Sequence, residues 1–273
     1  MFQTILEQVH AAHPLVHCIT NYVTAAGCAD LLLACGASPV MADDPGEVAE
    51  ITAHSAALCL NLGTLRQEKI SSLLLAGKTA NRLKIPVVLD PVGAGASVLR
   101  TRTALQLLSE IRFTAVRANA SELRALLLGI HTECGVDAAV CDRISDETLP
   151  QAVSLAKSFA AKYRTVTAMT GAIDIVTDGG PAYCIRNGHP MMRRITGSGC
   201  QLSALAAAFL GANPINTLNA AAAAVCAMGL TGELAYTRLG PLDGSGSYRC
   251  YMLDAMYHLT PAQLEEGARY ELR

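Results

Sequence analysis

The stretch PVVLDPVGAG, residues 86–95, decides the fold class. It begins with a short apolar run that ends at Asp90, and a proline and a glycine-rich turn follow directly. A short apolar run without polar alternation, bounded by turn residues, is typical of a strand buried on both faces of a parallel sheet. The stretch therefore predicts a parallel strand with a carboxylate at its carboxyl end.

The rest of the chain repeats this pattern, alternating short apolar runs with longer amphipathic segments. We predict strands over residues 15–20, 38–41, 57–62, 86–89, 115–117 and 165–168. We predict helices over residues 24–34, 47–56, 67–83, 98–110, 121–127 and 149–163. An antiparallel pair is expected at 173–176 and 182–185, with an almost entirely helical remainder from residue 199. The alternation predicts an α/β fold, a single domain over residues 1–273 with a central, mostly parallel sheet flanked by helices.

Composition excludes several classes of protein. The 273 residues are 51% hydrophobic and 16% charged, which excludes a disordered chain. Lys+Arg 21 against Asp+Glu 23 leaves a net charge of −2, so we expect no nucleic-acid partner. The longest apolar stretch, residues 220–230, is shorter than the ~18 residues of a membrane span, and the N-terminus lacks a secretory signal pattern. Ten scattered cysteines without a Cys-x-x-Cys pair indicate reduced thiols, so we expect a cytoplasmic protein.

The sharpest local signal is TGSGC, residues 196–200, at the start of an apolar helix-like stretch. The amides of Gly197, Ser198 and Gly199 together with the positive end of a helix dipole would form an anion hole suited to phosphate. Cys200 would lie in the first helical turn, where the pKa of a thiol commonly falls below its usual ~8.5. The alternatives are a tight turn for the glycines and a buried structural thiol for Cys200.

Acidic and basic residues follow the predicted strands. Asp90 and Glu122 could support a Mg²⁺–nucleotide, since magnesium takes one or two protein carboxylates. Considered without the other motifs, Asn119 and Glu122 also have the three-residue spacing that is typical of a helix capping box. Arg117 could bind nucleotide phosphates or form a surface ion pair. His17, inside an apolar strand, is expected to be a hydrogen-bonded core histidine.

Six motifs then occur in a familiar order: PLVHCITNYV at 14–23, GASPVM at 36–41, NLGT at 61–64, LDPVGAG at 89–95, RANASE at 117–122 and TGSGC at 196–200. Together they resemble the hydroxyethylthiazole kinase family, ribokinase-like enzymes of thiamine salvage, from about residue 14 to residue 258. The resemblance implies a three-layer ribokinase-like fold and a homotrimer with active sites between subunits. It also implies ATP-dependent phosphorylation of the primary alcohol of 4-methyl-5-(2-hydroxyethyl)thiazole.

The resemblance implies roles for individual residues as well. The thiazole-contacting positions match Met41, Asn21, Val23 and Gly197, and the ATP-contacting positions match Arg117 and Thr170. The acidic positions near Mg²⁺ match Asp90 and Glu122, and the proposed catalytic base matches Cys200. Two departures from the family pattern, Ala172 in place of glutamate and an insertion at residues 242–245, bear on ATP affinity.

Three other functions remain open from the sequence. The first is a kinase for another small alcohol, such as a hydroxymethylpyrimidine or a sugar. The second is a thiol hydrolase or acyltransferase with Cys200 as nucleophile, which needs a nearby histidine, His189 being the closest along the chain. The third is a regulatory homologue that binds ATP without turnover.

Overall fold

A nine-stranded sheet runs through the centre of the structure, a computed structural model that describes residues 1–129 and 144–273. Its first six strands are mutually parallel, in the order β2 (Ser38–Val40), β1 (Leu15–Ile19), β3 (Ala57–Asn61), β4 (Val87–Asp90), β5 (Ala115–Asn119) and β6 (Val166–Thr170). Three antiparallel strands complete the sheet: β7 (Asp174–Thr177), β8 (Ala182–Ile185) and β9 (Tyr270–Leu272). The prediction of a mostly parallel central sheet is confirmed.

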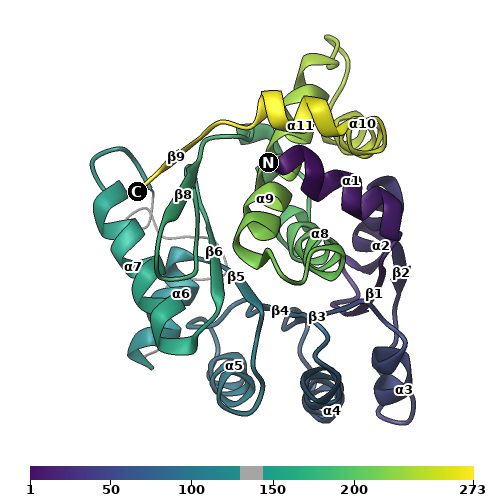
Figure 1. Ribbon diagram of the computed structural model, residues 1–273, viewed down its shortest axis with the longest axis vertical. Helices are drawn as coiled ribbons and strands as arrows, with labels where there is room; N and C mark the ends of the chain where they lie inside the picture. Colours follow the sequence, from purple (N-terminus) through teal and green to yellow (C-terminus); the bar gives the residue numbers. More distant parts are fainter. Residues whose placement is uncertain (130–143) are drawn as a thin grey trace.

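Helices cover both faces of this sheet (Figure 1). One face carries α1 (Phe2–Ala12), α2 (Ala25–Ala34), α8 (Ser198–Ala212) and α9 (Thr217–Thr237), with α10 (Ser245–Tyr257) and α11 (Pro261–Gly267) beyond them. The other face carries α3 (Val48–Ala53), α4 (Gln67–Leu83), α5 (Val98–Glu110), α6 (Ala120–Leu128) and α7 (Leu149–Tyr163). A short 3-10 segment, η2 (Pro190–Arg194), precedes α8.

Each face has its own hydrophobic core, and the strands contribute alternate residues to the two. In β3, Ala57 and Cys59 belong to the core under α8 and α9, while Leu58 and Leu60 belong to the core under α4 and α5. All five residues of β3 are buried. Because both faces of the strand need apolar side chains, the sequence shows an unbroken apolar run instead of alternation.

The boundaries of α4, α5 and α7 agree with the prediction, and most other elements shift by one or two residues. Among the described residues, α1, η2 and β9 were missed. Helix α1 was not predicted, although its buried residues Phe2, Ile5, Leu6 and Val9 have helical spacing. The expectation of an almost entirely helical remainder from residue 199 is confirmed, and its exception is the three-residue strand β9, which pairs antiparallel with β8.

Helix α9 shows why hydropathy alone overstates membrane character. Its 21 residues are long and apolar enough to cross a membrane by length and composition, so the prediction that this stretch is too short was too strict. However, 78% of its most apolar window is buried within the protein. The alanine run at residues 220–224 is fully packed between neighbouring helices and the sheet, as expected for a core helix.

Candidate active site

The predicted site residues gather at the carboxyl ends of the parallel strands, around the buried Asp90 at the end of β4. Its Oδ2 accepts hydrogen bonds from Asn61 Nδ2 at 2.7 Å and Ser203 Oγ at 2.8 Å. Its Oδ1 lies 3.4 Å from Arg117 Nη1. The parallel register places Asn61 beside Asp90 and so brings β3 and β4 side chains together. Asp90 therefore joins three elements through one buried carboxylate.

Arg117 comes from β5 and points across the same edge of the sheet. Its Nη2 donates to Thr170 Oγ1 at 2.8 Å, and its buried Nε has no hydrogen-bond partner within the described residues. Burial opposes the charged form, but the carboxylates of Asp90 and Glu122 outweigh it and raise the pKa of Arg117. The ion pair is thus largely buried, unlike the surface pair considered from the sequence, and it leaves one guanidinium donor unsatisfied.

The N-terminus of α8 lies against this guanidinium. Among the residues that the structure describes, no side chain caps the helix, whose N-cap residue Gly197 has the left-handed φ of +84°. A Cβ added to Gly197 would lie 2.4 Å from Thr24 Cγ2, and one added to Gly199 would lie 2.5 Å from both Arg117 Nη atoms. Only glycine at these two positions allows Thr24 and Arg117 to approach the helix end. The free amides of the first turn and the guanidinium together favour an anion.

Cys200 lies in the first turn of α8 and is partly exposed. Its Sγ accepts a hydrogen bond from Asn21 Nδ2 at 3.4 Å, and the same amide donates to Asn61 Oδ1 at 3.0 Å. Burial and the Asp90 carboxylate raise the pKa of the Cys200 thiol, although Arg117 acts in the opposite direction. The expectation of a lowered thiol pKa was wrong, because burial and a neighbouring negative charge outweigh the helix dipole.

Glu122 combines a structural role with an electrostatic one. It forms a capping box with Asn119 at the start of α6, and its Oε1 accepts from the Gly93 amide at 2.9 Å. Burial is the main cause that raises the pKa of Glu122 to about 7, and repulsion from Asp90 adds to it. The capping interpretation is confirmed for both Asn119 and Glu122.

The two carboxylates suit magnesium in their chemistry. Within residues 1–129 and 144–273, no group of three or more His, Cys, Asp or Glu is arranged to hold a metal ion. Magnesium needs fewer protein ligands, because it keeps several waters and takes one or two carboxylates together with substrate phosphates. A cation near Asp90 and Glu122 would also relieve the repulsion between them. The residues therefore fit a magnesium ion held through its water ligands, since their oxygens already accept protein hydrogen bonds.

Met41 lines a cavity of about 200 Å³ next to the loop that carries Asn21. The cavity lies between β1, the segment after β2 and the start of α4, and its lining residues are Cys18, Thr20, Tyr22, Ala25, Met41, Ala42, Asp43, Thr64, Arg66 and Lys69. Asn21 connects the cavity to Cys200, because it follows Thr20 directly and contacts the thiol. Val23 is exposed on the same loop and is not among the lining residues.

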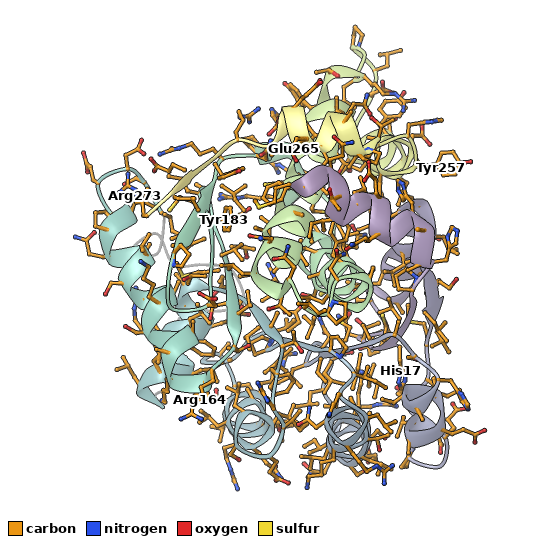
Figure 2. The ribbon with its side chains drawn as sticks, viewed as in Figure 1. His17, Arg164, Tyr183, Tyr257, Glu265 and Arg273 are labelled. Atoms are coloured by element: carbon orange, nitrogen blue, oxygen red, sulfur yellow. The ribbon has the colours of Figure 1, made fainter. Side chains whose placement is uncertain are left out.

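His17 is the hydrogen-bonded core histidine that the sequence predicts (Figure 2). Its Nε2 lies 2.8 Å from the carbonyl of Ala42 and its Nδ1 lies 2.8 Å from Thr52 Oγ1. The carbonyl can only accept, so Nε2 carries the proton and Nδ1 accepts from Thr52. His17 therefore ties β1 to the segment that carries Met41.

His189 does not serve Cys200. It stacks on Tyr236 with ring centroids 3.5 Å apart, and its Nδ1 accepts from the Met191 amide at 3.2 Å. In the part of the chain that the structure describes, the side-chain hydrogen bond to Cys200 Sγ comes from Asn21. Within residues 1–129 and 144–273, no hydrogen bond gives Cys200 the histidine base that the thiol hydrolase alternative requires.

Sequence reasoning gave no role to Asn61 and Ser203, which both bind Asp90. A signal existed for each. Asn61 ends a predicted strand next to that of Asp90, and Ser203 lies three residues after Cys200, on the same face of α8. The departures from the family pattern lie outside this network of side chains: Ala172 is exposed between β6 and β7, and the inserted Asp243 accepts from the Gly240 amide in an exposed turn.

Comparison with known proteins agrees with these motifs. The model of the Hydroxyethylthiazole kinase family matches residues 6–262. A curated hydroxyethylthiazole kinase from Clostridium acetobutylicum is 53% identical over 271 residues, covering 99% of both chains. One from Desulfovibrio desulfuricans is 45% identical over 264 residues, covering 94% of this chain and 93% of its own.

Solved structures extend the likeness to the fold. A hydroxyethylthiazole kinase protein from Pyrococcus horikoshii OT3 superposes with a TM-score of 0.87 at 33% identity, covering 100% of this chain and 98% of its own. A pyridoxal kinase from Staphylococcus aureus, solved with ADP, has a TM-score of 0.58 at 15% identity and covers 81% of this chain and 88% of its own, which shows the fold alone. The three-layer ribokinase-like fold is confirmed, and the chain belongs to the hydroxyethylthiazole kinase family.

Proposed function

We propose that this protein transfers the γ-phosphoryl group of ATP to the primary alcohol of 4-methyl-5-(2-hydroxyethyl)thiazole, a step of thiamine salvage. The observation that carries the proposal is the uncapped N-terminus of α8 with the Arg117 guanidinium against Gly199. The buried Nε of Arg117 lacks a partner within the described residues, so an incoming phosphate oxygen would satisfy it. Family membership supports the same activity.

A protein catalyses phosphoryl transfer mainly by positioning the two substrates and by stabilising the charge of the transition state. The amides of Ser198 and Gly199, the helix dipole and Arg117 would face the charge that develops on the transferred group. Thr170 and Asp90 hold Arg117 in place, so the guanidinium would need little rearrangement when ATP binds. In this proposal, Arg117 and Thr170 contact ATP, and Gly197, Ser198 and Gly199 form the anion hole.

The alcohol would enter between Asn21 and Cys200. The thiazole ring would occupy the cavity beside Met41, with Asn21, Val23 and Gly197 along the path to the reacting oxygen. The hydroxyl proton would pass to Cys200 Sγ late in the reaction, because a loose transition state leaves that proton in place until bond formation is advanced. Cys200 must be a thiolate to accept it, and its raised pKa makes this form scarce at neutral pH.

Asp90 and Glu122 would hold a magnesium ion through its water ligands. When bound, magnesium would neutralise charge on the phosphates of ATP. Both residues also have roles without it, because Asp90 orients Arg117 and Asn61 while Glu122 anchors the glycine-rich turn after β4.

We further propose a cytoplasmic homotrimer in which each chain is a single kinase domain. Tyr22 and Val23 are 80% and 56% exposed, and Met41 beside them is 38% exposed. Exposed apolar side chains next to a binding cavity are typical of a surface that another chain covers. A neighbouring subunit in that position would close the thiazole cavity.

The experiment is an alcohol panel with ATP. ADP release and phosphate ester formation are measured for the thiazole alcohol, a hydroxymethylpyrimidine and several sugars, with and without Mg²⁺. We expect magnesium-dependent ester formation with the thiazole alcohol in preference to the others. Preference for a pyrimidine or a sugar, ATP binding without turnover, or an acyl-enzyme detected by mass spectrometry would contradict the proposal.

A further inference from the structure

Lys69, near the start of α4, buries its ammonium group at the wall of the cavity that holds Met41. The residue is only 5% exposed. Its Nζ donates to the carbonyl oxygen of Thr20, its one hydrogen-bond partner in residues 1–129 and 144–273. An ammonium group has three N–H donors, so two remain for a molecule that enters the cavity.

A buried cation with unused donors is costly unless an acceptor pairs with it. Burial lowers the pKa of Lys69, while the nearby Asp43 carboxylate counteracts part of this shift. No salt bridge within 4 Å joins Lys69 to Asp43 in the described part of the chain. We therefore expect the ligand to provide the hydrogen-bond acceptor for the unused N–H donors of Lys69.

Backbone strain marks the same cavity as a functional site. Thr64, another lining residue, has a φ of +46°, although its β-branched side chain disfavours the left-handed region. Such conformations are strained and persist where the surroundings enforce them, often at ligand sites. Here the preceding Gly63 amide donates to Asn61 Oδ1, which ties the turn to the Asp90 network.

The apolar part of the lining suits a soft heteroaromatic ring. Cys18 and Met41 provide sulfur, Ala25 and Ala42 provide methyl groups, and Tyr22 provides an aromatic ring. Sulfur and aromatic groups pack well on polarisable rings. Asp43 and Arg66 also line the cavity, but both are exposed, whereas Lys69 is buried and so supplies a desolvated charged donor for a single acceptor atom in the ring.

We propose that Lys69 Nζ donates a hydrogen bond to the ring nitrogen of the thiazole alcohol, which makes Lys69 a specificity-determining residue. This inference rests on the proposed function, because it places that substrate in the cavity. The ring lies beside Met41, and its hydroxyethyl arm runs past Asn21, the neighbour of Thr20, towards Cys200. Lys69 thus selects a nitrogen-containing ring over one of the same shape without an acceptor.

The test compares the thiazole alcohol with its thiophene analogue, in which a C–H group replaces the ring nitrogen. The parent protein should prefer the thiazole in kcat/KM by about ten- to a hundredfold, the range for a hydrogen bond to a charged group. The lower kcat/KM of the thiophene analogue should come mainly from a higher KM, because the ring is remote from the transferred phosphoryl group. If the parent protein turns over both alcohols equally well, the inference is overturned even without a variant.

Variants then assign the preference to Lys69. In Lys69→Met the ratio of the two kcat/KM values should fall close to one, mainly because the thiazole loses affinity. Lys69→Arg retains donors and should retain part of the preference. Lys78→Met, on the same helix but exposed, should leave the ratio unchanged. An unchanged ratio in Lys69→Met, or an equal loss for both alcohols, would show a purely structural role and overturn the inference.

Failure of the inference and failure of the proposed function are distinguishable. If the parent protein phosphorylates neither alcohol, the kinase proposal itself fails. If it phosphorylates both without preference, the kinase proposal stands and only the role of Lys69 is lost.

Discussion

At the residue scale, the proposed chemistry depends on the Cys200 thiol and on the amides at the start of α8. Cys200 is joined to Asp90 through Asn21 and Asn61, so a hydrogen-bonded chain leads from the thiol to the buried carboxylate. The sequence could predict Cys200 in the first turn of a helix, because the glycines before it mark that turn. It could not predict the direction of its pKa shift, since that depends on burial and on the distance to Asp90, which only the fold determines.

The role of the thiol can be tested by substitution. Cys200→Ala should lower kcat by about a hundredfold, the lower end of the range for a positioned base, with little change in KM for the alcohol. Cys200→Asp should retain substantial activity, because a carboxylate can accept the same proton. An unchanged kcat in Cys200→Ala would remove the thiol from the mechanism.

The raised pKa of Cys200 also predicts a pH profile. If the thiolate accepts the proton, kcat of the parent protein should rise as the pH increases above neutrality. In Cys200→Asp the rise should move to lower pH, because a carboxylic acid ionises more readily than a thiol. Identical profiles for the two proteins would contradict the assignment of Cys200 as the base.

Met41 tests the position of the thiazole ring. A contact between methionine sulfur and an aromatic ring contributes about 0.3–1.5 kcal/mol, so Met41→Ala should raise KM for the thiazole alcohol by up to about tenfold. The KM for ATP should not change, because Met41 lies in the neighbouring cavity. Steady-state kinetics with each substrate varied in turn measure both values, and an unchanged KM for the alcohol would show that the ring binds elsewhere.

At the scale of single elements, the N-terminus of α8 is the feature on which the site depends. The amides and the dipole of α8 meet the Arg117 guanidinium of β5, which lies far away in the sequence. The contact between the two is at Gly199. The glycines of the TGSGC motif predicted the start of this helix correctly. The close approach of Arg117 was not predictable, because a glycine in a sequence shows that space is needed but not which side chain fills it.

Gly199→Ala should therefore impair phosphoryl transfer while the protein stays folded. The added methyl group would lie 2.5 Å from the Arg117 guanidinium and displace it. The loss of one preorganised donor typically costs about 2.7–4 kcal/mol, so we expect kcat to fall by a factor of about 10²–10³. Gly180→Ala in the β7–β8 turn is the matched control, since its added methyl group would meet only the flexible Asp178 carboxylate, at 3.3 Å. Equal activity of the two variants would argue against Arg117 at the anion hole.

Elements outside the strand–helix alternation were the ones that the sequence prediction missed. Strand β9 has three residues at the edge of the sheet, two of them exposed, and its pairing with β8 exists only once the C-terminal segment has folded back. Such a strand carries no local signal. Helix α1, in contrast, has a clear apolar stripe through Phe2, Ile5 and Val9, and its omission was not forced by the sequence.

At the scale of the whole molecule, the sheet positions the site and buried polar contacts brace it. His17 links β1 to Thr52 in α3 and to the segment after β2. Burial lowers the pKa of His17, so the folded protein holds it neutral. As the pH falls below about 6.5, the unfolded chain takes up a proton that the folded protein does not, and the free energy of unfolding decreases.

Replacement by glutamine removes this titration. Above about pH 6.5 the parent protein should be more stable than His17→Gln, and the difference should shrink at lower pH by at most about 1.4 kcal/mol per pH unit. Urea unfolding at neutral and mildly acidic pH measures the difference, and all other titrations are shared by the two proteins. A difference that grows as the pH falls would contradict a neutral buried histidine.

The oligomeric state is a further property of the whole molecule that can be measured. We expect a particle with three times the 28.6 kDa mass of the chain, as the family resemblance implies, with a neighbouring subunit covering the exposed Tyr22 and Val23 beside the Met41 cavity. Light scattering during size-exclusion chromatography determines the mass. A Tyr22→Asp variant should weaken the assembly and raise KM for the alcohol together. A fully active monomer would contradict a site shared between subunits.

A labelled γ-phosphoryl group shows directly whether phosphoryl transfer takes place at the N-terminus of α8. The parent protein and Gly199→Ala are each incubated with labelled ATP, Mg²⁺ and the thiazole alcohol, and the label is located by mass spectrometry. We expect the label on the hydroxyl oxygen of the thiazole alcohol, rapidly with the parent protein and very slowly with Gly199→Ala. Label that remains in ATP, or that appears only as inorganic phosphate, would contradict phosphoryl transfer to this alcohol at the N-terminus of α8.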